Sequence, residues 1–317
     1  MLELKNISKA YPGVQALNQV SLHIQAGEIF AICGENGAGK STLMNIITGN
    51  IDPDDGELIW EGRPVRFASF RAAADLGIAI VYQERSLVDE LSVAENIYVE
   101  KPPLTSWGLI DFKQLWQQTL HLLQGLGLED MAPQTMVSSL SPAQKQMVEI
   151  AKALAAQPKL LILDEPTSAI GEKETTVLFN ILQKLKEAGV AIVYISHRMA
   201  EIFQIADQIT VLKDGVGQGS FAATTLNPQQ LIQLMVGRAL PTSSFQTDAK
   251  NETCLEVDQI SGPGFQEISF DIKRGEIFAL AGLIGAGRTE LALALFGDAP
   301  IRTGKLRLNG REVRFKD

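Results

Sequence analysis

Nine consecutive residues near the N-terminus have the types and spacing of a phosphate-binding loop. Gly34–Thr42 reads GENGAGKST and fits the pattern G-x-x-x-x-G-K-[ST]. Glycines let backbone N–H groups turn toward phosphate oxygens, Lys40 can reach the β- and γ-phosphates of a nucleotide, and Ser41 can bind Mg²⁺. The candidate phosphate contacts are Gly34, Glu35, Asn36, Gly37, Ala38, Gly39, Lys40, Ser41 and Thr42. A Gly-rich turn without a ligand is the alternative interpretation.

Two adjacent carboxylates, Asp164 and Glu165, follow the apolar run Leu160–Leu163. In a protein with a phosphate loop, Asp164 is placed to hold Mg²⁺, directly or through water. Glu165 is then the candidate base, or water-orienting group, for attack on the γ-phosphate. Side chains alternate along a strand, so the two carboxylates need not face the same way. A carboxylate pair that simply begins a loop is the alternative.

One of the three histidines, His197, follows a third apolar run, Ala191–Ile195, with Ser196 between them. The carboxyl ends of parallel strands form the edge at which α/β proteins bind ligands. At that edge His197 can contact the γ-phosphate or hold the attacking water. A structural or solvated histidine is the alternative.

The elements that must position these residues are visible in the hydrophobic pattern. Continuous apolar runs predict strands buried on both faces of a parallel sheet, at Ile29–Cys33, Leu160–Leu163 and Ala191–Ile195. Alternating runs predict half-exposed strands at Leu2–Lys5 and Leu22–Gln25. Helical periodicity predicts helices over Lys40–Thr48 (ended by Gly49), Phe112–Leu126 and Ala143–Ala156. The expected fold class is α/β with a mostly helical insert at about 84–157.

The sequence also repeats itself at a constant offset of 248 residues, because SLHIQAGEIFAICGENGAGKSTL corresponds to SFDIKRGEIFALAGLIGAGRTEL. The offset matches Gly27 with Gly275, Gly34 with Gly282, Gly56 with Gly304 and Phe67 with Phe315. Such spacing indicates two copies of one domain. We expect a complete first domain at 1–240, a linker at 241–253 rich in Ser, Thr and Asp, and an incomplete second copy at 254–317.

Composition narrows the function classes. The net charge of −9 argues against broad electrostatic binding to nucleic acid or anionic lipid. No apolar run approaches the roughly 18–20 residues that span a bilayer, and the N-terminus has no signal segment. The two cysteines, Cys33 and Cys254, have no pairing or metal-ligand spacing, which favours a reducing cytosol. A membrane role would therefore come from a partner.

On these residues the chain resembles the ATP-binding cassette (ABC) family, specifically the duplicated ATPase of bacterial monosaccharide importers with its second cassette truncated. The resemblance covers essentially the whole chain, and the motifs fall in family order. They are Gly34–Ser41 as Walker A, Gln83 as the Q-loop, Leu140–Gln144 as the signature, Leu160–Glu165 as Walker B, Ser168–Gly171 as the D-loop and His197 as the switch histidine.

The resemblance implies a P-loop NTPase cassette with a mostly parallel core sheet, an antiparallel β subdomain and a helical insert, plus the start of a second cassette. It implies that Tyr11 stacks on adenine and that Gln83 contacts the metal and the attacking water. It also implies that Tyr82–Val99 carries the surface that meets a membrane subunit. The exposed apolar residues of that segment can equally be insert core.

Two departures from the family pattern stand out. The signature, usually Leu-Ser-Gly-Gly-Gln, reads Leu140, Ser141, Pro142, Ala143, Gln144. Ser141 suits a helix N-cap, Pro142 the first helical position and Gln144 the capping-box partner. Pro142 has no N–H to donate, which predicts a weakened contact with phosphate. In the second copy Arg288 replaces the Walker A lysine. The planar guanidinium of arginine is not equivalent to the compact ammonium of lysine.

The function that the resemblance implies is an ATPase subunit, using ATP and Mg²⁺, that energises monosaccharide import. Its partners would be transmembrane permease subunits, a periplasmic sugar-binding protein and a facing ABC domain that completes the ATP site, without nucleic acid. It would lie peripherally on the cytoplasmic side of the inner membrane. The alternatives are a nucleoside importer, a soluble ABC ATPase without a transport role, and a form that binds ATP with little turnover.

Overall fold

The computed structural model describes residues 1–83, 86–168, 170–237, 250–282 and 285–313. The chain divides into two compact units, Met1–Leu240 (unit 1) and Pro241–Asp317 (unit 2). Phe315 and most of the expected linker at 241–253 lie outside the described residues.

A six-stranded sheet forms the centre of unit 1, with the strand order β10-β9-β3-β8-β7-β6. Its strands are β3 (Ile29–Cys33), β6 (Ile78–Val81), β7 (Leu160–Asp164), β8 (Ala191–Ile195), β9 (Gln208–Lys213) and β10 (Val216–Ala222). Every neighbouring pair is parallel except β9 and β10, which form an antiparallel hairpin. The three continuous apolar runs are therefore central strands, as predicted, and their apolar residues are buried.

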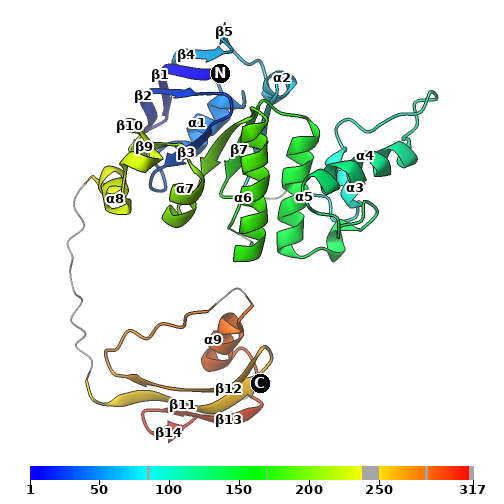
Figure 1. Ribbon diagram of the computed structural model, residues 1–317. Helices are drawn as coiled ribbons and strands as arrows, with labels where there is room; N and C mark the ends of the chain where they lie inside the picture. The colour runs from blue at the N-terminus through cyan, green and yellow to red at the C-terminus, as the bar shows by residue number, and fades with distance from the viewer. Residues whose placement is uncertain (84–85, 169, 238–249, 283–284, 314–317) are drawn as a thin grey trace. The chain divides into compact units, whose positions relative to one another are not determined.

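Helices cover both faces of this sheet (Figure 1). Alternate residues of β7 separate the two cores: Leu160 and Ile162 pack with the first helix, while Leu161 and Leu163 pack with residues of α5 and α6. The helices that surround the sheet are α1 (Lys40–Ile47), α2 (Phe70–Asp75), α5 (Pro142–Ala155), α6 (Glu172–Glu187), α7 (Met199–Ile205) and α8 (Pro228–Val236), with a 3₁₀ turn at Ala223–Thr225. This double coverage explains why β7 is apolar at successive positions.

A four-stranded antiparallel sheet in the order β2-β1-β4-β5 packs over α1. Its strands are β1 (Leu2–Tyr11), β2 (Val14–Ile24), β4 (Asp55–Trp60) and β5 (Arg63–Val65). The alternation noted in the sequence is confirmed, because Leu2, Leu4, Leu22 and Ile24 are buried and their neighbours are more exposed.

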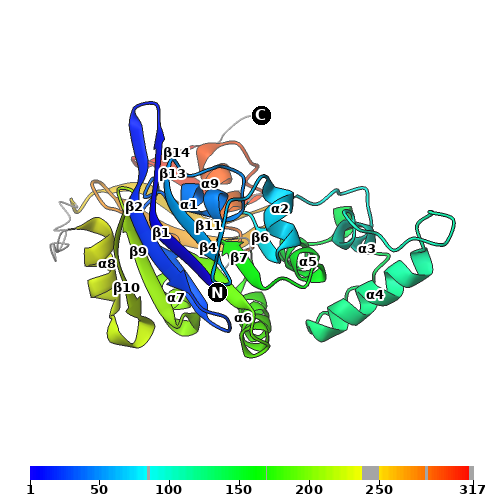
Figure 2. The ribbon, with the colours of Figure 1, turned by 90° about the horizontal axis from the view of Figure 1, so that it is seen from above.

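The helical insert contains α3 (Val93–Ile97), α4 (Phe112–Gly125), a 3₁₀ turn at Val137–Ser139, and α5. Figures 1 and 2 place α3 and α4 at the end of unit 1 opposite α8 and β10. The predicted helices at Phe112–Leu126 and Ala143–Ala156 are confirmed to within one residue at each end. In the segment proposed for partner contact, Val93 and Ile97 are insert core, while Val88 and Val99 are exposed.

Unit 2 repeats the strand order of the antiparallel sheet, as β12-β11-β13-β14. Its elements are β11 (Thr253–Gly262), β12 (Phe265–Lys273), α9 (Arg288–Phe296), β13 (Thr303–Leu308) and β14 (Arg311–Glu312). The repeat is thus structural as well as sequential. One counterpart differs: residues 277–281, which the offset matches to β3, form no strand, and Ile277 is 83% exposed.

No helix in the portions of the chain that the structure describes has the length and apolar character of a membrane span.

Candidate functional site

The phosphate loop connects β3 to α1, as the sequence predicts. Gly39 is the N-cap of α1, with φ of 100°, and Thr48 is its C-cap, followed by Gly49 with φ of 71°. Within the loop the Ala38 N–H donates to the Glu35 carbonyl at 3.1 Å. The loop therefore stands at the carboxyl end of a central strand and opens onto the N-terminus of a helix, which favours bound anions.

The Lys40 ammonium lies over this loop. Its Nζ donates to the carbonyls of Gly34 at 2.8 Å and Glu35 at 3.0 Å. Burial lowers the pKa of Lys40, whereas the charges of Asp164 and Glu165 act in the opposite direction. Lys40 is thus a desolvated cation that can exchange its two carbonyl partners for phosphate oxygens.

Two glycines of the loop are required by close backbone contacts. A Cβ at Gly34 would lie 2.4 Å from the Leu212 carbonyl oxygen, and a Cβ at Gly39 would lie 2.4 Å from the Ala16 carbonyl oxygen. The loop is therefore wedged between the end of β9 and the start of β2. These contacts restrict the shape of the loop.

We expect Gly39→Ala to destabilise the chain more than Gly37→Ala. Both residues have positive φ, at 100° and 86°, so both substitutions carry the strain of a left-handed side chain. Only the Cβ at Gly39 meets backbone, since Gly37 faces open space. The overpacking should cost a further 1–3 kcal/mol or so in the free energy of unfolding, measured by urea titration. Equal losses in the two variants would contradict the wedged loop.

The acid pair ends β7 at the same edge. Asp164 is the last residue of the strand, and Glu165 has a φ of 48° while its N–H donates to the Ile195 carbonyl at 2.9 Å. Burial raises the pKa of Asp164, the charge of Glu165 adds to this, and Lys40 opposes it. The charges of both carboxylates act on Lys40, so the acid pair lies near the lysine of the phosphate loop.

Asp164→Asn is expected to increase the stability of the nucleotide-free chain. The folded-state pKa of Asp164 is raised, so its ionised form is disfavoured and lowers the free energy of unfolding at neutral pH. The gain should shrink as the pH falls through the folded-state pKa, because wild-type Asp164 then takes up a proton. Urea titrations over a pH series test this, with exposed Asp130→Asn as the control. A gain independent of pH would contradict the electrostatic cause.

His197 meets the acid pair directly. Its Nδ1 lies 3.0 Å from Glu165 Oε1, and the His197 side chain is 65% exposed while that of Glu165 is 20% exposed. The histidine loop after β8 and the acid loop after β7 are neighbours because the two strands pair in parallel. The structure therefore brings together Lys40, Asp164, Glu165 and His197.

Two further predicted residues lie near this edge. Tyr11 ends β1 and is 43% exposed, and it pairs with Val14 in the hairpin that leads to Ala16, the residue packed on Gly39. Gln83 is exposed and follows β6, the strand beside β7. Both positions are compatible with the roles that the family resemblance implies.

The signature segment stands apart from these residues. Ser141 is the N-cap of α5, Pro142 is its first residue, and the predicted capping box is confirmed: Ser141 Oγ accepts from the Gln144 N–H at 3.2 Å and the Ser141 N–H donates to Gln144 Oε1 at 2.9 Å. Leu140 is buried in the insert core and Ala143 packs against it. In the described part of the chain no hydrogen bond joins Leu140–Gln144 to the phosphate loop.

The D-loop segment is described except for Ala169. The Ser168 N–H donates to the Glu165 carbonyl at 3.2 Å, and Gly171 is the N-cap of α6. Thr167 lies between the acid pair and Ser168 in the sequence. Thr167 is buried, and so is Glu201 of α7. Sequence reasoning missed both residues, since the only local signal is an acidic residue in the first turn of a short helix.

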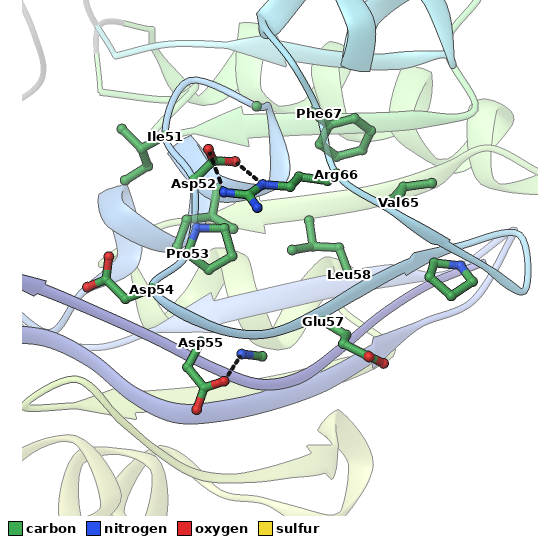
Figure 3. Close-up of a pocket in the computed structure, with 14 residues that line it drawn as sticks. Ile51, Asp52, Pro53, Asp54, Asp55, Glu57, Leu58, Val65, Arg66 and Phe67 are labelled. Atoms are coloured by element: carbon green, nitrogen blue, oxygen red, sulfur yellow. Dashed lines mark hydrogen bonds and ion pairs between the residues drawn. The ribbon is translucent and has the colours of Figure 1, made fainter.

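A cavity of about 440 Å³ lies at the other end of α1 (Figure 3). Ile46 and Gly49 line it together with β4, β5 and the segment between α1 and β4. Two of its carboxylates are paired within the protein, Asp52 with Arg66 at 3.1 Å and Asp54 with Lys9 at 2.6 Å. None of the phosphate-loop residues lines this cavity, so it is separate from the candidate site.

Comparison with protein families gives a match to the ABC transporter family over residues 17–168 and 265–317. Over 99% of its length the chain is 45% identical to a putative ribose/galactose/methyl galactoside import ATP-binding protein of Agrobacterium fabrum, of which it covers 62%. It is also 45% identical to a ribose import ATP-binding protein of Rhodopirellula baltica, covering 64% of that protein. The chain thus spans less than two thirds of the length of these relatives.

Solved structures support the same fold. An ATP-binding cassette of an ABC transporter in its ADP conformation aligns with a TM-score of 0.65 and 25% identity, covering 75% of this chain and 99% of that one. A bacterial ABC transporter cassette solved as a dimer aligns with a TM-score of 0.62 and 28% identity, covering 70% of this chain and 99% of the other.

Proposed function

The chain belongs to the ABC transporter family, and from this we propose that unit 1 is a cassette that binds and hydrolyses ATP, with unit 2 as the start of a second cassette. The observation that supports this best is the meeting of four groups at one sheet edge. Lys40 lies over the phosphate loop, the charges of Asp164 and Glu165 act on Lys40, and His197 contacts Glu165. This arrangement suits phosphoryl transfer, in which positioning and charge stabilisation do most of the work.

The residues present fit Mg²⁺. Ser41, Asp164 and Gln83 would hold it through oxygen atoms, which are the ligands that Mg²⁺ prefers. The raised pKa of Asp164 fits as well, because a cation beside this carboxylate would relieve the penalty on its charged form. Among the described residues no three His, Cys, Asp or Glu gather as a metal site, so phosphate and water would supply the other ligands. Bound Mg²⁺ would neutralise charge on the β- and γ-phosphates.

Each remaining residue has a role in the proposal. Glu165 takes a proton from the attacking water or orients it, and His197, paired with Glu165, holds that water or contacts the γ-phosphate. Tyr11 stacks on adenine. A facing cassette supplies the signature for this site, while the segment Leu140–Gln144 serves the site opposite with a helix N-terminus that lacks one N–H at Pro142.

We further propose that the ATPase energises import of a monosaccharide. Support comes from the relatives, which are named as ribose and galactose import ATP-binding proteins. Its partners would be a transmembrane permease and a periplasmic sugar-binding protein, and it would act at the cytoplasmic side of the membrane. Binding of candidate sugars and nucleosides to the partner binding protein would distinguish sugar import from nucleoside import.

The test of the proposed function begins with the purified full chain. Binding of a fluorescent ATP analogue and release of phosphate from MgATP are measured side by side. Binding with turnover supports an ATPase, and absence of binding contradicts the proposed site. If the chain co-sediments with membranes only when the permease is present, a transport role is supported. Co-sedimentation with ribosomes instead would contradict it.

A further inference from the structure

A buried carboxylate next to the loops of the candidate site, that of Glu201, accepts hydrogen bonds from four side chains. Glu201 lies in the first turn of α7 and is 8% exposed. Its Oε2 accepts from Thr167 at 2.7 Å, from Tyr194 at 2.9 Å and from Ser196 at 3.2 Å. Its Oε1 accepts from Arg198 at 3.1 Å. A buried charge is costly unless it is paired and hydrogen-bonded, and here both conditions are met.

Three of the four donors come from the two loops that carry the hydrolytic residues, and the fourth, Tyr194, lies in β8. Thr167 lies two residues after Glu165, in the loop that follows β7. Ser196 and Arg198 flank His197, in the loop that follows β8, and the Arg198 N–H donates to Ser196 Oγ at 3.0 Å. The Glu201 carboxylate therefore links the acid loop after β7 to the histidine loop after β8. The same two loops also meet directly, through the contact of His197 with Glu165.

We propose that Glu201 is a positioning residue that holds Glu165 and His197 in register, acting through Thr167 and Ser196. This inference rests on the proposed function, in which Glu165 and His197 act on bound ATP. Rigid loops matter there because a displacement of about 1 Å can cost on the order of a hundredfold in rate. Within the described residues no hydrogen bond or ion pair joins Glu201 to the phosphate loop, so its effect on the reaction would pass through the two loops.

The phosphate loop joins β3 to α1, and none of the four donors to Glu201 belongs to it. Helix α7 packs in one apolar cluster with β3 through Ile202, which substitution of Glu201 leaves in place. Loss of the Glu201 network should therefore lower the rate of ATP hydrolysis without weakening nucleotide binding. A purely structural role predicts something else: binding and hydrolysis would fall together with the folded fraction. The ratio between the two losses distinguishes a positioning residue from a stabilising one.

The main variants are Glu201→Gln, which keeps the shape but replaces an acceptor by an amide, and Thr167→Val, which removes one donor. Thr167→Ser restores the hydroxyl and should restore activity. Thr119→Val is the matched control, because Thr119 is as buried as Thr167 and its hydroxyl donates to the Leu115 carbonyl at 2.8 Å. We expect kcat to fall on the order of tenfold or more in the first two variants, with Kd for MgATP within about twofold of wild type.

A second readout does not depend on turnover. The chain contains three histidines, so the ring signals of His197 can be assigned by NMR with a His197→Gln variant. Glu201→Gln and Thr167→Val should shift these signals, and Thr119→Val should leave them in place. If Glu201→Gln fails to fold, the Thr167 pair carries the test alone.

The outcomes are separable from those for the proposed function. Unchanged His197 signals in Thr167→Val would overturn the inference, and so would a Kd that rises in step with the fall in kcat. If the wild-type chain binds no nucleotide, the proposed function fails, and the link from Glu201 to the histidine loop is then decided by the NMR signals. Shifted signals with rescue by Thr167→Ser support that link.

Discussion

Lys40→Ala is expected to remove most of the affinity of the chain for ATP. The ammonium lies over the phosphate loop with two carbonyl partners, and the charges of Asp164 and Glu165 act on it. Hydrogen bonds to charged groups contribute about 1.5–3 kcal/mol, which corresponds to a rise in Kd of roughly 10- to 150-fold. Titration with a fluorescent ATP analogue measures the loss.

The fold should survive this change, because burial already disfavours the charged form of Lys40. Circular dichroism of the variant checks that expectation. Lys159→Ala is a suitable control, since Lys159 pairs with Glu61 at the surface at 2.7 Å. Unchanged affinity in Lys40→Ala would show that ATP, if it binds, binds elsewhere.

Glu165→Gln is expected to abolish most hydrolysis while nucleotide binding persists. The amide keeps the size of the side chain but cannot take a proton from water, and a positioned general base contributes about 10²- to 10⁴-fold to a rate. The backbone should tolerate the change, because the Glu165 N–H to Ile195 carbonyl contact does not involve the side chain. Single-turnover release of phosphate from bound ATP is the measurement.

Glu187→Gln, near the end of α6, is the matched control for charge and should retain wild-type turnover. His197→Gln provides a second comparison, because it removes the partner of Glu165 without removing the carboxylate. Full turnover in Glu165→Gln would exclude this residue as the base. An equal loss of binding and turnover would assign it to nucleotide binding instead.

Local features of this fold were well predicted from sequence. The strand at Ile29–Cys33, the helix that begins at Lys40 and the capping box at Ser141 all depend on short-range patterns of burial and on hydrogen bonds within one turn. The repeat predicted the matching strand orders of the two antiparallel sheets. These features are local or periodic, so neighbouring residues carry the information.

Other features depend on pairings between distant strands. The contact of Glu165 with His197 arises because β7 and β8 are neighbours, and 32 positions separate the two residues in sequence. Glu201 accepts hydrogen bonds from two loops and from β8, and its own segment shows only an acid in a helical turn. Likewise the positive φ of Glu165, at 48°, is not revealed by the sequence pattern.

Residues 277–281 of unit 2, which form no strand, have a consequence for handling the protein. In unit 1 the strand β3 is hydrogen-bonded on one side to β8 and on the other to β9, whereas its counterpart at residues 277–281 reads IFALA and forms no strand. A short, uncharged, β-prone segment with free backbone groups is a template for pairing with other chains. We therefore expect this segment to promote aggregation at high concentration. A charged substitution at Ile277, which is 83% exposed, should reduce light scattering without altering the melting of unit 1.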